Sequence, residues 1–130
     1  MNRTVLETDK APSAIGPYSQ AVKAGGFLFV SGQLPMDAKT GEIVPGDAAS
    51  QARKALENMR GILEEASLTM ADVVKVTICL TNMGDFTSVN EVYATFFSNE
   101  PPARICYEVS TLPKNVNVEM DCIAVLSASE

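Results

Sequence analysis

VVKVTICLT, residues 73–81, is the stretch that decides the fold, because apolar and polar side chains alternate along it. This period of two predicts a strand with one apolar face, formed by Val74, Val76, Ile78 and Leu80. Helical patterns flank the strand on both sides. Asp47 is a good N-cap for a helix over 48–66, and Asp85 for a second helix over 86–98.

Further strands are expected before and after this helix–strand–helix unit. The pattern favours short strands at 3–7 and 19–24, a strand at 27–31 after a Gly25-Gly26 turn, and two later strands at 103–110 and 116–126. Apart from the first short segment, the order is β-β-α-β-α-β-β. We therefore expect residues 1–130 to form one α+β domain, a mixed sheet with two helices on one face.

Two helices cover only one face of such a sheet. Alternation within 103–110 places Ile105, Tyr107 and Val109 on one face and Arg104, Cys106 and Glu108 on the other. We expect the uncovered face to carry Arg104, Cys106 and Glu119 together with Ile123 and Val125. A face that mixes apolar and functional side chains in this way predicts an interface between subunits.

Composition excludes several classes of function. The net charge is −6 and the pI is about 4.6, which argues against a nucleic-acid-binding surface. Histidine is absent, so Ser-His-Asp catalysis, Cys-His catalysis and His-ligated zinc are excluded. The three cysteines form no C-x-x-C pair, and no apolar run predicts a signal peptide or a membrane span. These features favour a reduced, cytoplasmic protein.

Three segments resemble the YjgF/RidA family, the reactive intermediate deaminases. They are APSAIGPYSQA (11–21), FVSGQLPMDAKTGEIV (29–44) and PPARICYEVSTLPKNVNVEM (101–120), and the resemblance runs from about residue 5 to 126. It implies a chorismate-mutase-like domain that assembles as a homotrimer with pockets between subunits, and a last strand inside the sheet. It also implies hydrolysis of 2-imino acids, such as 2-iminobutanoate and 2-iminopropanoate, to 2-oxo acids and ammonia, without metal or cofactor. Such imines leak from PLP-dependent dehydratases.

The resemblance gives roles to the most distinctive polar residues. Arg104 would hold the substrate carboxylate with its two-pronged guanidinium, although alone it also fits an edge-strand arginine covering apolar surface. Glu119 would position or deprotonate water, although a lone glutamate is more often solvated. Tyr18 would close the pocket and offer its hydroxyl, or simply pack in a loop. Cys106 would form a pocket wall rather than a covalent nucleophile, or a small buried apolar group.

Four further positions are expected to line the substrate pocket. Ser31 and Gly32 follow the FLFV segment, where a glycine lets the backbone approach a ligand closely, although a Ser-Gly pair is also a common strand end. Phe86 and Asn90 lie one helical turn apart, and Phe86 is equally a core aromatic. The chain departs from the family pattern at Ile105, where a small residue is usual. By alternation this side chain points away from Arg104, so we expect altered packing rather than a lost site.

Two other functions compete with the deaminase. A trimer that binds 2-oxo acids without turnover would use the same arginine clamp. An endoribonuclease or translation inhibitor, reported for some relatives, agrees least with the acidic charge and the absence of histidine. The sequence leaves the preferred imino acid and the upstream enzyme open.

Overall fold

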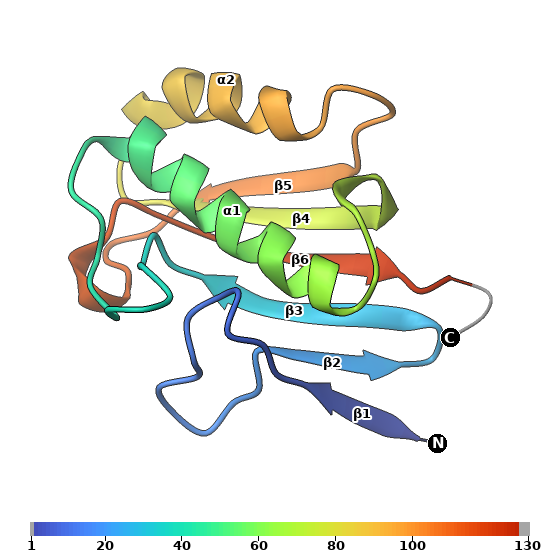
Figure 1. Ribbon diagram of the computed structural model, residues 1–130. Coiled ribbons are helices and arrows are strands. Elements are labelled where there is room, and N and C mark those ends of the chain that lie inside the picture. The colour runs from blue at the N-terminus through green and yellow to red at the C-terminus, as the bar shows by residue number, and fades with distance from the viewer. Residues whose placement is uncertain (1, 128–130) are drawn as a thin grey trace.

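The computed structural model describes residues 2–127 and has the predicted α+β architecture (Figure 1). Six strands form one sheet in the order β1-β2-β3-β6-β4-β5, and both helices lie on the same face of it. The elements are β1 Arg3–Leu6, β2 Ala21–Ala24, β3 Phe27–Gln33, α1 Ala48–Glu65, β4 Val73–Leu80, α2 Phe86–Phe96, β5 Ala103–Glu108 and β6 Val118–Val125. Their bounds differ from the predicted ones by one or two residues.

Helix α1 closes the core as its apolar stripe predicts. The Asp47 side chain accepts a hydrogen bond from the Ser50 backbone N–H at 2.9 Å, which caps the first turn. Leu56, Met59 and Ile62 on the inner face have no exposed surface. Asp85 also lies at the N-cap position of α2, but its side chain accepts no capping hydrogen bond.

The last strand lies inside the sheet, as the family resemblance implies. Strand β6 runs antiparallel to both β3 and β4, while β4 and β5 are parallel, so the sheet is mixed. Gly25 and Gly26 form the β2–β3 hairpin turn with φ values of +59° and +85°. Two consecutive positive φ values are strained for any residue with a Cβ, which explains the glycine pair.

The prediction for the start of the central strand is wrong in one respect. Val73 is buried and Val74 is exposed, the reverse of the expected alternation. The β4–β6 register shifts between Val73 and Lys75, so the extra residue of a bulge turns Val74 outward. From Val76 to Leu80 the predicted apolar face is buried.

The expected placement of Arg104 and Cys106 on the uncovered face is also wrong. On the neighbouring strand β4, Val76 pairs with Arg104 and Ile78 pairs with Cys106. Val76 and Ile78 both belong to the core beneath the helices. The guanidinium and the thiol therefore lie on the helix-covered side of the sheet. Alternation within β5 is as predicted, but the two faces are interchanged.

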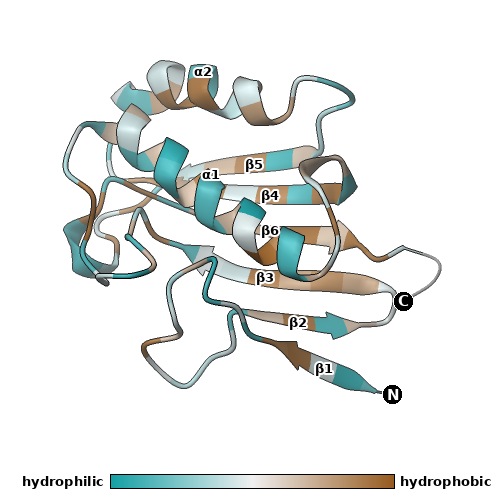
Figure 2. Ribbon diagram, viewed as in Figure 1, coloured by the Kyte–Doolittle hydropathy of each residue, from teal (hydrophilic) through white to brown (hydrophobic). Residues whose placement is uncertain are grey.

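The face without helices exposes large apolar side chains. This explains why the apolar residues of β5 lie on that face rather than under the helices. It exposes between 38% and 50% of each of the large side chains Val5, Phe27, Phe29, Ile105, Tyr107 and Val125. Hydrophilic colours gather along α1, and hydrophobic colours along β3 and β6 (Figure 2). Within residues 2–127 no helix has the length and apolarity needed to cross a membrane.

Candidate functional site

Arg104 reaches from β5 to one side of α2. Its Nη1 donates a hydrogen bond to Asn90 Oδ1 at 2.6 Å. The guanidinium carbon also lies 5.4 Å from the ring centroid of Phe86 and 4.9 Å from that of Tyr93, both within cation–π range. The structure thus brings together three of the predicted residues, Arg104, Asn90 and Phe86. It adds Tyr93, to which the sequence analysis assigned no role.

The spacing in α2 explains how one helix holds the arginine. Phe86, Asn90 and Tyr93 are four and three residues apart, so their side chains share a helix face. Asn90 uses one of the five guanidinium N–H donors, and within residues 2–127 no carboxylate forms a salt bridge with Arg104. The result is an oriented cation with donors to spare. It borders an open cleft of about 420 Å³ lined also by Ala94, Phe97 and Pro101.

Cys106 lies on the same sheet face as Arg104 and packs against the core. Burial raises the pKa of its thiol, and the Arg104 charge opposes that rise only in part. A thiol kept protonated is a poor nucleophile. Cys106 is not among the residues that line the Arg104 cleft, so its role as a pocket wall stays a prediction, and its protonated thiol argues against covalent catalysis.

The remaining predicted residues gather around a second cleft, of about 450 Å³. Tyr18, Ser31, Gly32 and Glu119 line it together with Ile15, Leu34 and Pro113, which the sequence analysis did not single out. A Cβ on Gly32 would lie 2.5 Å from Glu119 Oε2, so the glycine leaves the space that the carboxylate occupies. The Ser31 hydroxyl donates to the Ser19 carbonyl at 2.5 Å, which fixes this end of β3 to the preceding loop.

Glu119 is the acidic group of the second cleft. Burial raises its pKa above the usual glutamate range, and the neighbouring Asp121 charge raises the pKa further. A carboxylate in this condition accepts a proton more readily than an exposed one, as a general base requires. Among residues 2–127 no cluster of three or more cysteine or acidic side chains is arranged to hold a metal ion.

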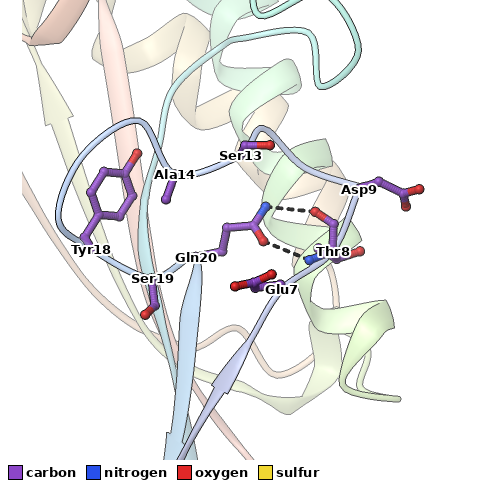
Figure 3. A pocket seen from close by; sticks show the side chains of 8 residues that line it. All are labelled: Glu7, Thr8, Asp9, Ser13, Ala14, Tyr18, Ser19 and Gln20. Carbon is purple, nitrogen blue, oxygen red and sulfur yellow. Dashed lines mark hydrogen bonds between the residues drawn. The ribbon is translucent and has the colours of Figure 1, made fainter.

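Gln20 positions the loop that carries Tyr18. Its side-chain amide is buried, donates to the carbonyls of Thr8, Ala11 and Pro12, and accepts from the Thr8 N–H at 2.8 Å. Figure 3 shows Gln20 directed at Thr8 across the base of the loop, with Tyr18 at its far side. The Tyr18 hydroxyl accepts from the Ile15 N–H at 3.3 Å. Buried amides of this kind leave no periodic signal in the sequence, so Gln20 was not predicted to have a role.

The two groups of residues do not meet within one chain. Glu119 is level with Cys79, which alternates with the buried Ile78 and Leu80 and so lies on the face without helices. Arg104 lies on the opposite face. The predicted site residues are therefore brought together as two half-sites, one around Arg104 and one around Glu119.

Comparisons with known proteins agree with these segments and this fold. The family model described as Endoribonuclease L-PSP matches residues 8–126. A RutC family protein of Pyrococcus horikoshii is 54% identical over 94% of this chain and 97% of its own. The Escherichia coli K12 protein named "Putative reactive intermediate deaminase TdcF" is 45% identical over 97% of this chain and 99% of its own.

Solved structures agree in the same way. The crystal structure of Escherichia coli TdcF with bound serine has a TM-score of 0.90 and 45% identity, and covers 95% of this chain and 99% of that one. A Thermotoga maritima structure described as "a putative endoribonuclease" reaches a TM-score of 0.92 at 49% identity, and covers 96% of this chain and 98% of that one. The chain therefore belongs to the YjgF/RidA family, whose family model carries the name Endoribonuclease L-PSP.

Proposed function

We propose that the chain hydrolyses reactive 2-imino acids, such as 2-iminobutanoate and 2-iminopropanoate, to 2-oxo acids and ammonia. The observation that carries this proposal is the Arg104 guanidinium, which Asn90 and two aromatic rings orient and which no carboxylate neutralises within residues 2–127. A planar cation with free parallel N–H donors matches a carboxylate in shape and charge. Every 2-imino acid offers that carboxylate beside its reactive carbon.

The reaction needs little more than orientation and one proton carrier. A water oxygen adds to the imine carbon while Glu119 takes one proton from the water and passes it to the imine nitrogen, which gives a carbinolamine. Glu119 then takes the remaining proton from the hydroxyl oxygen and gives it to the amine nitrogen, so that the carbon–nitrogen bond breaks, ammonia leaves, and the oxygen remains as the 2-oxo group. The raised pKa of Glu119 suits both halves of this exchange. Tyr18 would close the cleft with its ring and offer its hydroxyl to the imine or the water.

The site would be completed by a second subunit. Because Arg104 and Glu119 lie on opposite faces of one sheet, a substrate that touches both must lie between two chains. The exposed apolar face, with Phe27, Phe29 and Val125, supplies a surface whose burial favours assembly. We infer a homotrimer in which the Arg104 half-site of one chain faces the Glu119 half-site of the next. The related TdcF was crystallised with bound serine, which is consistent with a small-molecule site in the family.

One coupled assay tests the function. A threonine dehydratase generates 2-iminobutanoate, and its decay is followed with and without this protein. Faster decay supports the deaminase. Tight binding of 2-oxobutanoate without faster decay would instead indicate a regulatory trimer. Cleavage of RNA by a preparation that leaves the imine untouched would support the endoribonuclease.

A further inference from the structure

The hydroxyl of Tyr93 has no hydrogen-bond partner. The side chain is 5% exposed, and among residues 2–127 its oxygen is the one buried side-chain nitrogen or oxygen without a partner. Burying an unpaired hydroxyl is unfavourable, because the hydrogen bonds that it made with water are lost and not replaced. A buried polar group without a partner is uncommon in native proteins and calls for a physical reason.

Tyr93 lies in the wall of the Arg104 cleft. It lines the cleft of about 420 Å³ together with Asn90 and Arg104. Its ring contacts the Phe97 ring at a centroid distance of 4.6 Å and the Arg104 guanidinium at 4.9 Å. These contacts hold the ring in place, with the Arg104 guanidinium over its face.

The hydroxyl remains a donor at physiological pH. Burial raises the pKa of Tyr93 to about 12, although the Arg104 charge acts in the opposite direction. A protonated phenol donates a hydrogen bond, and the bond is stronger when the acceptor is a carboxylate than when it is neutral. Arg104, by contrast, is exposed and held by a single side-chain hydrogen bond. It is the part of the cleft that can move.

We propose that Tyr93 is a second donor of the anion site, and that its hydroxyl donates a hydrogen bond to a carboxylate oxygen of the ligand that Arg104 holds. Arg104 moves from the Tyr93 ring toward the carboxylate as the ligand enters, which opens the hydroxyl to the cleft. This proposal rests on the proposed function for the identity of the ligand. It explains why an unpaired group is kept in the core.

Tyr93→Phe tests the proposal because it keeps the ring and removes only the hydroxyl. We expect the affinity for 2-oxobutanoate, and for propionate as a simple carboxylate, to fall about tenfold, the effect of one hydrogen bond to a charged group. The free energy of unfolding without ligand should stay the same or rise, because the hydroxyl has no partner to lose. Tyr107→Phe is the matched control, because it removes a hydroxyl from β5 outside both clefts and keeps the aromatic ring on the face proposed for assembly.

A spectroscopic readout reports on the hydroxyl directly. The chain has three tyrosines and no tryptophan, so a tyrosine difference spectrum on adding propionate is easy to assign. We expect the spectral change to persist in Tyr107→Phe and to be reduced in Tyr93→Phe. Wild-type affinity in Tyr93→Phe would overturn the proposal, and so would a loss of stability, since that would show a partner within the protein.

The outcomes separate this inference from the proposed function. If the wild type binds propionate through Tyr93 but does not accelerate imine decay, the anion site stands and the deaminase function fails. If the wild type hydrolyses imine and Tyr93→Phe binds and turns over normally, the function stands and the inference fails. If the wild type binds no carboxylate at all, both are wrong.

Discussion

Arg104 and Glu119 lie on opposite faces of the same sheet, the first against α2 and the second beside the cleft that Tyr18 and Gly32 line. Strands are straight enough that side chains on opposite faces cannot converge on one small molecule. If one substrate contacts both residues, as we propose, each half-site is incomplete when a chain is alone, and chemistry depends on assembly. Each of the following predictions tests one part of this proposal.

Arg104→Lys should lose most activity although the charge is kept. A lysine ammonium is a point charge on a flexible stem, and it cannot hold Asn90 and a carboxylate in one plane. Losing one charge-assisted hydrogen bond should slow hydrolysis by about tenfold to hundredfold. The measurement is kcat/KM for imine decay, with Arg53→Lys on the exposed side of α1 as the control. Full turnover in Arg104→Lys would remove the clamp from the mechanism.

Glu119→Gln should separate binding from chemistry. The amide can hold a water but cannot take its proton, so 2-oxobutanoate affinity should stay near the wild-type value while hydrolysis slows. In the wild type the active form is the ionised carboxylate, so the rate should fall as pH drops through the raised pKa. Asp121→Asn removes one cause of the raised Glu119 pKa, so the fall in rate on the acidic side of the pH–rate profile should move to lower pH. An unchanged profile would contradict the role of Glu119 as the general base.

Glu119 should lower the free energy of unfolding at neutral pH. Because folding raises the pKa of Glu119, the folded state favours the protonated form, and the ionised form is penalised above the folded pKa. Glu119→Gln should therefore unfold at a higher denaturant concentration than the wild type at neutral pH. The difference should disappear below the ordinary glutamate range, where the carboxyl is neutral in both states. Equal protein concentrations keep assembly comparable.

Gly32→Ala should impair catalysis more than folding. The new methyl group would meet the far end of the Glu119 side chain, which can swing aside at little cost to stability but no longer occupies the same position. We expect near-normal thermal unfolding with hydrolysis slowed about tenfold or more. Gly16→Ala is the matched control, since its Cβ would make an ordinary contact of 3.7 Å with Tyr18. Equal activity of both variants would show that the carboxylate position is unimportant.

Phe29→Glu should disrupt assembly. Phe29 lies in β3 on the face without helices, level with Ile123, so its exposed ring is available to another chain. A buried carboxylate there would be strongly unfavourable in an interface and harmless in a monomer. Light scattering should show a trimer for the wild type and for Lys39→Glu, and a folded, inactive monomer for Phe29→Glu. A wild-type monomer at micromolar concentration would contradict the shared site.

The sequence predicted local structure well where one physical signal dominates. Helix α1 has both a cap at Asp47 and an apolar stripe, and the Gly25-Gly26 pair requires a turn. The site residues were predicted differently, from the resemblance of whole segments that carry Arg104 and Glu119, and their catalytic roles stay predictions. The bulge at Val74 depends on pairing with β6, which no local pattern records.

The orientation of β5 is the main point that the sequence could not decide. Alternation indicates which side chains share a face but not which face is covered. The apolar character of Ile105 and Tyr107 favours the core, yet both lie on the face without helices, which is itself apolar. Tyr93 was missed for a similar reason, since an aromatic residue in a helical stripe looks the same whether or not its hydroxyl is paired.

Mixed oligomers test the central claim, the shared site, most directly. Arg104→Ala and Glu119→Gln chains are each expected to be inactive alone, and they are unfolded together, refolded as an equal mixture and assayed for imine decay. In an equal mixture, half of the chains keep Arg104 and the other half keep Glu119. If each site takes Arg104 from one chain and Glu119 from the next, about one quarter of the sites therefore contain both residues. The account predicts activity near one quarter of the wild type. A mixture no more active than its two components would contradict it, because a site within one chain cannot be repaired by a neighbour.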